Sequence, residues 1–192
     1  MTVTKHAHTE VIRSSNEDLR KSIVSLAAAL ERDPKSAKVA FRATTSLEDG
    51  VRCSVQVREF APLVVDEPPA LGGTDAGMNP VELVLSALGT CQQIVYAAYA
   101  SVMGIRLDEV SVDCKGHLNL RGLFGIGSEA RPGYSEVRFE TSITSPEPAD
   151  RIQELVALAE SRCPVLDILT RPIPVRGSVV LNGEHIHQQA WG

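Results

Sequence analysis

The segment from residue 79 to residue 104 constrains the fold of this 192-residue chain more than any other. Asn79 suits the N-cap of a helix, Pro80 suits the first helical position, and Glu82 stands where the acid of a capping box belongs. Gly104 suits the residue that ends a helix in a left-handed conformation. The sequence therefore predicts one long helix between these caps.

The composition of this helix is that of a membrane span or of a helix inside a protein core, because residues 81–103 are nearly free of charge. Small or polar residues interrupt the apolar run at Glu82, Gly89, Thr90, Gln92 and Gln93. We therefore predict a buried central helix.

Shorter patterns predict the elements on either side. Before the central helix we expect an amphipathic helix over 15–31, with Ser15 and Asp18 as a capping box, and strands over 38–44, 51–58 and 63–65 with a turn at Asp49-Gly50. After it we expect strands over 110–115 and 136–143 around a glycine-rich surface loop at 121–134, a helix over 149–162, a strand over 173–181 and a polar tail. Because the strands are grouped, these elements predict an α+β fold with antiparallel sheet and not a doubly wound fold.

Two glycine-rich segments lack the features of nucleotide sites. After Gly72–Gly77, Met78 and Asn79 stand where a phosphate-binding loop needs a lysine and a hydroxyl residue. The glycines at 122, 125 and 127 do not open a helix after a strand, so no helix N-terminus is directed at a pyrophosphate. We therefore expect no nucleotide cofactor.

Charge and histidine placement narrow the function further. The net charge of −5 is spread along the chain, without a basic run interleaved with aromatic residues, so nucleic acid is not an expected partner. The histidine pairs at 6 and 8 and at 185 and 187 have no third ligand nearby in the sequence, so no metal site is expected.

Four cysteines, at positions 53, 91, 114 and 163, form no CxxC motif. The N-terminal residues lack the apolar core of a secretory signal, so we expect a cytoplasmic protein. Thiols are reduced at rest in that compartment, and any disulfide here is expected to be transient and catalytic. Cys53 and Cys114 occupy apolar-facing positions in alternating strands, which favours simple packing for both.

The other two cysteines lie on the apolar faces of the long helices. Cys91 is on the central helix, where composition favours a buried core thiol, but Thr90, Gln92 and nearby tyrosines offer hydrogen bonds to a thiolate or a substrate. Cys163 comes directly before Pro164, where free backbone N–H groups favour a thiolate, although a core thiol is again the alternative. If the two helices pack together, the thiols can approach within disulfide range.

Two segments resemble one known family. GGTDAGMNPVELVLSALGTCQQ resembles the central-helix motif of OsmC/Ohr proteins, and AESRCPVLDIL resembles their Cys-Pro helix. The resemblance spans about residues 37–181 and includes the order of strands and helices. It divides the chain into an N-terminal extension (1–36), an OsmC-like domain (37–181) and a polar C-terminal tail (182–192).

The resemblance implies an intertwined homodimer, with antiparallel sheets wrapped around two long central helices, an extra N-terminal helix and one thiol site per chain near the interface. It also implies reduction of organic hydroperoxides in oxidative-stress defence. Cys91 would attack the peroxide, Cys163 would resolve the resulting sulfenic acid as a disulfide, and a dithiol reductant would restore both.

The resemblance also implies a glutamate and an arginine that activate the attacking thiol. Ohr-type members of the family carry a glutamate directly after Asn-Pro, whereas this chain has Val81 there and Glu82 one residue later, rotated by about 100° around the helix. The family's arginine comes from the first hairpin, where Arg52 is our preferred candidate over Arg42. Glu82 is therefore expected to act either at the site or only as a helix cap.

Two other functions remain open at the level of sequence. A protein of the same fold could bind an apolar small molecule at the dimer interface, with Cys91 merely lining the pocket. Alternatively, the chain could form a structural or regulatory dimer in which both cysteines are buried and too far apart to pair.

Overall fold

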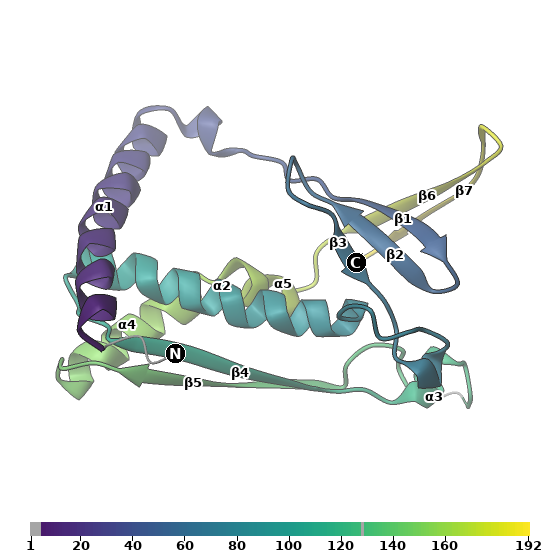
Figure 1. Ribbon diagram of the computed structural model, residues 1–192. Helices are drawn as coiled ribbons and strands as arrows, with labels where there is room; N and C mark the ends of the chain where they lie inside the picture. Colours follow the sequence, from purple (N-terminus) through teal and green to yellow (C-terminus); the bar gives the residue numbers. More distant parts are fainter. Residues whose placement is uncertain (1–4, 128) are drawn as a thin grey trace.

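Helices and antiparallel strands occur in groups along the chain, as the computed structural model shows for residues 5–127 and 129–192 (Figure 1). The elements before the central helix are α1 (Lys5–Arg32), η1 (Pro34–Ala37), β1 (Thr44–Asp49), β2 (Arg52–Gln56), β3 (Leu63–Val65) and η2 (Pro69–Leu71). The central helix and the elements after it are α2 (Pro80–Met103), β4 (Glu109–His117), α3 (Leu120–Leu123), β5 (Glu136–Thr144), α4 (Ala149–Ser161), α5 (Pro164–Thr170), β6 (Val175–Leu181) and β7 (Glu184–Trp191). Residues 1–4 of the predicted extension and residue 128 of the predicted loop lie outside the described residues.

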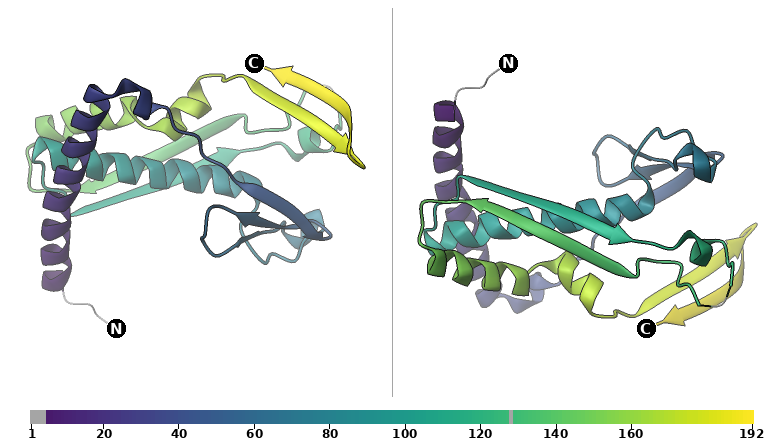
Figure 2. Two further views of the ribbon diagram at one scale, coloured as in Figure 1. Left: turned by 90° about the horizontal axis from the view of Figure 1, so that it is seen from above. Right: turned by 90° about the horizontal axis from the view of Figure 1, so that it is seen from below.

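The strands of the described residues form three separate antiparallel sheets. They are the three-stranded sheet β1-β2-β3 and the two-stranded ribbons β4-β5 and β6-β7. This arrangement confirms the prediction of an α+β fold with antiparallel sheets. The β4-β5 ribbon covers one side of α2, whereas the other two sheets lie toward the end of the molecule opposite α1 (Figure 2).

The central helix begins and ends as its sequence predicts. Asn79 Oδ1 accepts a hydrogen bond from the Glu82 amide, Glu82 Oε2 accepts one from the Asn79 amide, and Pro80 occupies the first turn. Gly104 ends the helix with a left-handed φ of 67°. Apolar residues of α2, α4 and the connection after α2 form the core: Tyr96, Ala100, Ile105, Leu107, Leu155 and Ala159.

By length and composition alone, α2 could cross a membrane, and it is the one helix of the described residues with that property. In the structure its buried face packs on β4 and α4, which is the place predicted for a central helix. The opposite face remains exposed, including Ile94 at 68%.

Two N-terminal elements differ in position from their predictions. The helix α1 begins at Lys5 and not near Ser15, because residues 5–14 contain no proline or glycine that would end a helix before Ser15. The first strand covers Thr44–Asp49, whereas alternation indicated 38–44. The turn at Gly50 pairs Asp49 with Arg52, and this register fixes which residue of β1 lies opposite each residue of β2.

The C-terminal segment 182–192 was expected to be a polar tail but forms strand β7. Asn182 and Gly183 have φ values of 51° and 93°, the left-handed geometry that closes a two-residue hairpin. The pairing of β7 with β6 then runs from Leu181↔Glu184 to Val175↔Trp191. The Asn-Gly pair is a hairpin signal that the polar composition of the segment obscures.

Two of the three sheets leave apolar side chains uncovered within one chain. Every residue of β1, β6 and β7 is exposed. The exposed apolar side chains of these strands include Leu47, Val175, Val179, Val180, Ile186 and Trp191. An isolated two-stranded ribbon is marginally stable in water, so these faces need a covering surface.

The loop that leads into α2 is organised by a buried carboxylate. Asp66 is 1% exposed and accepts hydrogen bonds from the Thr74 hydroxyl at 2.6 Å and from the backbone amides of Glu67, Thr74 and Ala76. The Thr74 hydroxyl is the main reason why the pKa of Asp66 lies well below its usual range; burial opposes this effect, and the amides reinforce it. The ionised carboxylate therefore holds the start of the central helix in place.

We predict that Asp66→Asn lowers the free energy of unfolding at neutral pH. The lowered pKa means that the contribution of Asp66 is present above the unfolded-state pKa of about 3.9 and is lost as pH falls through the lower folded-state pKa. Urea unfolding between pH 2 and 7 should therefore show a smaller acid-dependent loss in the variant. Asp75→Asn is the matched control, because Asp75 is exposed and asparagine tolerates its φ of 60°. Equal acid sensitivity of wild type and Asp66→Asn would contradict the assignment.

Candidate active site

Cys91 and Cys163 come together although they are far apart in the sequence. Cys91 is half-buried on α2, and Cys163 is 1% exposed at the N-cap of α5. Their Sγ atoms are 3.3 Å apart, with Cys163 donating and Cys91 accepting a hydrogen bond. The prediction that the two helix faces bring these thiols close is confirmed, which removes the alternative of cysteines too distant to pair.

Helix packing explains the position of each thiol. Leu155 and Ala159 of α4 pack in the core against Tyr96 of α2, and Cys163 follows Ala159 by one helical turn. Pro164 occupies the first turn of α5, so the chain ends one helix and starts the next at this point. Cys163 is thereby held against the turn of α2 that carries Cys91.

Burial is the main reason why the pKa of the Cys163 thiol is raised. Hydrogen bonds from the Leu166 and Val165 amides favour the thiolate and oppose this effect, whereas the hydrogen bond to Cys91 and its charge reinforce it. The raised pKa keeps Cys163 a thiol at neutral pH, and its S–H is directed at the Cys91 sulfur. In this arrangement the Cys91 sulfur accepts a hydrogen bond, and it is the sulfur that can act first as a nucleophile.

The remaining cysteines lie on strands, away from this contact. The Cys53 thiol donates weakly to the Val51 carbonyl at 3.8 Å. Cys114 is half-buried on β4, close to Gly89 of α2, and burial followed by the charge of Asp113 raises the pKa of its thiol. Cys53 lies in β2 and Cys114 lies in β4. Neither has a second thiol as a hydrogen-bond partner in the described part of the chain.

The structure places Glu82 and Arg52 away from the thiol contact. Glu82 is exposed and takes part in the capping box, which agrees with its interpretation as a cap. The Arg52 guanidinium lies beside Glu48 at 4.0 Å and Asp49 at 3.8 Å in its own hairpin. Among contacts of the described residues, none joins Arg52 to Cys91.

A cavity of about 360 Å³ is lined by residues of α2, β5 and α5 near the thiol pair, although neither cysteine is among its lining residues. Its walls include Leu88, one turn before Cys91, and Leu166, whose amide bonds the Cys163 sulfur. The other walls come from β5, α5 and the loop before β5, and they combine Val137, Phe139 and Leu169 with polar Arg131, Tyr134 and Glu136. The cavity therefore has a mixed lining of apolar and polar side chains, with Leu88 one helical turn from Cys91.

Tyr134 ties the glycine-rich loop to the central helix, a contact that sequence reasoning missed. Its hydroxyl donates to the Val81 carbonyl at 3.0 Å, and its ring lies over Gly116, where any Cβ would clash with it. Burial, and then the negative charge of Glu82, raises the pKa of Tyr134. Tyr134 thus attaches the end of this loop to α2 and β4 beside the cavity, with Gly116 as the sequence signal for a close approach.

Gln92 is a second residue whose role was not predicted beyond a possible hydrogen-bond partner. It is 0% exposed, and neither amide atom has a hydrogen-bond partner within residues 5–127 and 129–192. A buried polar group without a partner costs about 1–3 kcal/mol. In contrast, the neighbouring Gln93 donates to the Val110 carbonyl at 3.1 Å.

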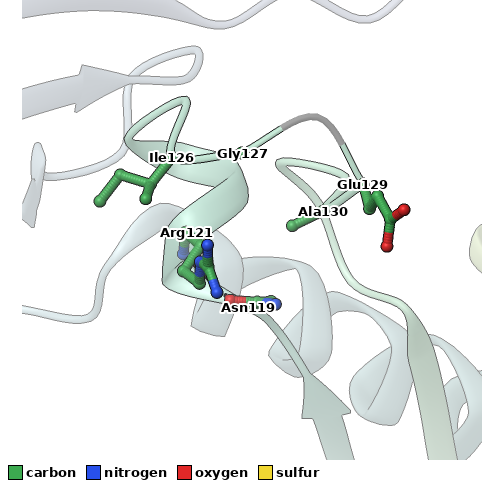
Figure 3. Close-up of a pocket in the computed structure, with 6 residues that line it drawn as sticks. All are labelled: Asn119, Arg121, Ile126, Gly127, Glu129 and Ala130. Atoms are coloured by element: carbon green, nitrogen blue, oxygen red, sulfur yellow. Dashed lines mark hydrogen bonds between the residues drawn. The ribbon is translucent and has the colours of Figure 1, made fainter.

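A larger cavity of about 550 Å³ lies in the loop around α3 and is lined by Asn119, Arg121, Ile126, Gly127, Glu129 and Ala130 (Figure 3). Asn119 already accepts a hydrogen bond from the Arg121 amide as the cap of α3. None of its lining residues belongs to α2, α4 or α5, the helices that position the thiol pair, so its volume does not make it the candidate active site. Likewise, no group of three or more potential metal-binding side chains occurs among the described residues.

A pair of adjacent thiols on packed helices, inside an α+β fold with antiparallel sheets, defines a dithiol protein. The chain belongs to the OsmC-like protein family, whose model matches residues 73–177. This match includes both cysteines and confirms the resemblance seen in the two sequence motifs. No curated protein matches the chain.

Solved structures with the same fold include proteins of several bacteria. The OsmC-like protein of Mycoplasma pneumoniae is 20% identical with a TM-score of 0.60, over 69% of this chain and 88% of that chain. An organic hydroperoxide resistance protein OsmC of Legionella pneumophila is 21% identical with a TM-score of 0.54, over 69% and 92%. A putative organic hydroperoxide resistance protein of Vibrio cholerae, with captopril bound in one of its active sites, is 17% identical with a TM-score of 0.52, over 78% and 96%. At these identities the likeness shows the fold.

We predict that a mild thiol oxidant such as diamide forms one disulfide, between Cys91 and Cys163. Contact of the two sulfurs allows the bond with little backbone movement, whereas Cys53 and Cys114 have no adjacent thiol among the described residues. Thiol titration under denaturing conditions should fall from four thiols to two, and peptide mapping should identify the linked pair. Disulfides that include Cys53 or Cys114 at comparable yield would contradict the geometry.

Proposed function

We propose that the protein reduces organic hydroperoxides with Cys91 as the attacking thiol and Cys163 as the resolving thiol. The observation that carries this proposal is the 3.3 Å contact between two chemically different sulfurs, one half-buried and one fully buried. Membership of the OsmC-like family supports it, as does the likeness in fold to organic hydroperoxide resistance proteins. The biological role would be defence against oxidative stress in the cytoplasm, where a dithiol reductant is present.

In the first step the Cys91 thiolate attacks the terminal oxygen of the hydroperoxide. The oxygen–oxygen bond breaks, the organic oxygen takes a proton and leaves as an alcohol, and Cys91 becomes a sulfenic acid. The more accessible sulfur is the one suited to this step, and the neighbouring cavity would hold the organic group with its apolar walls of Leu88, Phe139 and Leu166.

In the second step Cys163 attacks the oxidised sulfur. The Cys163 proton and the hydroxyl of the sulfenic acid leave together as water, and the Cys91–Cys163 disulfide forms. Two electrons have then passed from the thiols to the peroxide. An external dithiol reduces the disulfide and returns the site to its starting state.

Activation of Cys91 requires a positive charge, and we propose that Arg52 supplies it from a second copy of the chain. Within one chain β2 pairs with β1 and β3, and this sheet stands away from the middle of α2 (Figure 1). The exposed faces of β1, β6, β7 and α2 would be covered in a homodimer. In that assembly the hairpin of one chain could reach the site of its partner.

A second candidate function is non-catalytic binding of an apolar small molecule. The cavity of about 360 Å³, whose lining includes Leu88, Phe139 and Leu166, favours this alternative. So does Val81, which stands where Ohr-type members of the family have a glutamate after Asn-Pro. In this case Cys91 would line the site without reacting, and a ligand would remain bound through purification.

We predict that Cys91→Ser abolishes consumption of cumene hydroperoxide, whereas Cys163→Ser leaves one turnover and then stops. The reason is that Cys91 carries the first step alone, but Cys163 is needed to release it from the sulfenic acid. Peroxide loss, with dimedone trapping of the sulfenic acid, distinguishes the two variants. Cys114→Ser should retain wild-type turnover. Full turnover by Cys91→Ser would eliminate the peroxidase and leave the binding protein.

We further predict that Arg52→Met and Cys91→Ser complement each other in a mixed dimer. Each homodimer should have less than about a tenth of wild-type activity, because each lacks one essential group at every site. In the mixed dimer one site combines Cys91 of the first chain with Arg52 of the other, so activity should return to roughly half that of wild type if sites act independently. Arg42→Met is the matched control and should remain active. A mixed dimer as inactive as the two homodimers would contradict the shared site.

A further inference from the structure

Gln92 combines complete burial with an amide that has no hydrogen-bond partner in the described chain. It faces the interior of a single chain at 0% exposure, so covering the outer surface by a second chain would not provide that partner. Buried polar groups without partners are rare in folded proteins and are concentrated where function requires them. The amide therefore calls for a partner that forms inside the molecule.

The buried face of α2 that carries Gln92 belongs to a helix packed on α4 and α5, and Cys163 lies at the junction of those two helices. Leu88, Gln92 and Tyr96 are four residues apart, lie on one face of the helix and are all fully buried. Leu88 shares the wall of the cavity with Leu166, whose amide bonds the Cys163 sulfur. On the other side, burial is the main cause of the raised pKa of Tyr96, and the charges of Glu160 and Cys163 add to it.

The residues one turn before and one turn after Gln92 are thus both related to Cys163: Leu88 through the cavity wall that it shares with Leu166, and Tyr96 through the charge of Cys163. Cys91 and Gln92 are also adjacent in the sequence, on the turn of α2 that Cys163 contacts. Among the residues of that turn, Gln92 offers an N–H donor that no other group occupies within the described residues. Cys163, which contacts Cys91 on this turn, is the group that changes charge during the proposed reaction.

We propose that the Gln92 side-chain amide is a positioning residue for the resolving thiol: its Nε2–H donates a hydrogen bond to the Cys163 sulfur when that sulfur becomes a thiolate. This inference rests on the dithiol chemistry of the proposed function. The thiol form needs no such donor, because Cys163 then directs its own proton to Cys91. In the resting state the unpartnered Gln92 amide lowers the stability of the fold. When the Cys163 thiolate forms, the new hydrogen bond offsets this loss and so favours the thiolate during the reaction.

The donor acts in both directions of the disulfide reaction. During formation, the Cys163 thiolate attacks the Cys91 sulfenic acid, the sulfur–sulfur bond forms, and hydroxide leaves and takes up the proton that Cys163 lost. During reduction by dithiothreitol, the reagent thiolate attacks Cys91, the sulfur–sulfur bond breaks, and Cys163 leaves as a thiolate. The reverse step needs no peroxide, so it reports on Gln92 independently of the substrate.

The test compares Gln92→Met with Gln93→Met. Methionine keeps the length of glutamine but removes the amide, and Gln93 is the matched control because its amide has a structural bond to the Val110 carbonyl. Each protein is oxidised with diamide, and reduction of its Cys91–Cys163 disulfide by dithiothreitol is followed by acid quench and alkylation. We expect Gln92→Met to keep or raise the melting temperature and to slow the reduction about tenfold or more. We expect Gln93→Met to lower the melting temperature and to leave the rate within about twofold.

An unchanged reduction rate in Gln92→Met would overturn the proposal, as would equal slowing in both variants. If Gln92→Met does not fold, Gln92→Leu provides the same comparison. If the wild type consumes no cumene hydroperoxide but its disulfide reduction still depends on Gln92, the peroxidase assignment fails and the role of Gln92 is supported. If wild type and Gln92→Met consume peroxide at the same rate, and dithiothreitol reduces their disulfides at the same rate, the peroxidase assignment stands and the proposed role of Gln92 fails.

Discussion

Packing of α4 and α5 against α2 is the interaction on which the candidate site depends. The apolar contact of Leu155 and Ala159 with Tyr96 sets the distance between the two helices, and Pro164 ends one helix where the second thiol is needed. The capping box and Gly104 fix the length and position of α2, and Asp66 fixes the loop that enters it. The 3.3 Å contact between two sulfurs is therefore built by elements whose own stability comes from burial and caps.

The two sulfurs differ because their surroundings differ. Cys163 is enclosed, and burial keeps it as a thiol despite the amides of α5 that favour its anion. Cys91 is partly open and next to the cavity walls formed by Leu88 and Leu166. A pair with one accessible and one protected thiol separates an attacking step from a resolving step, which two equally buried thiols would not do.

Local signals in the sequence predicted much of this arrangement. The caps of α2, the turn at Gly50 and the apolar faces that carry Cys91 and Cys163 are each specified within a few residues, and each prediction is confirmed. The predictions for β1 and β7 were wrong for different reasons. The pairing of β1 with β2 fixes the bounds of β1, and apolar alternation does not reveal that pairing. The pairing of β7 with β6 makes a strand of a segment whose polar composition suggested a tail. The unpartnered amide of Gln92 and the contact of Tyr134 with Gly116 depend on residues distant in the chain.

The central claim is that Cys91 and Cys163 act as one two-electron unit. The most direct measurement is one equivalent of cumene hydroperoxide per chain, without a reductant, followed by quantification of alcohol, thiols and disulfide. The account predicts one alcohol formed, two thiols lost and one Cys91–Cys163 disulfide per chain. Intact peroxide, or thiol loss distributed over Cys53 and Cys114 with no Cys91–Cys163 bond, would contradict it.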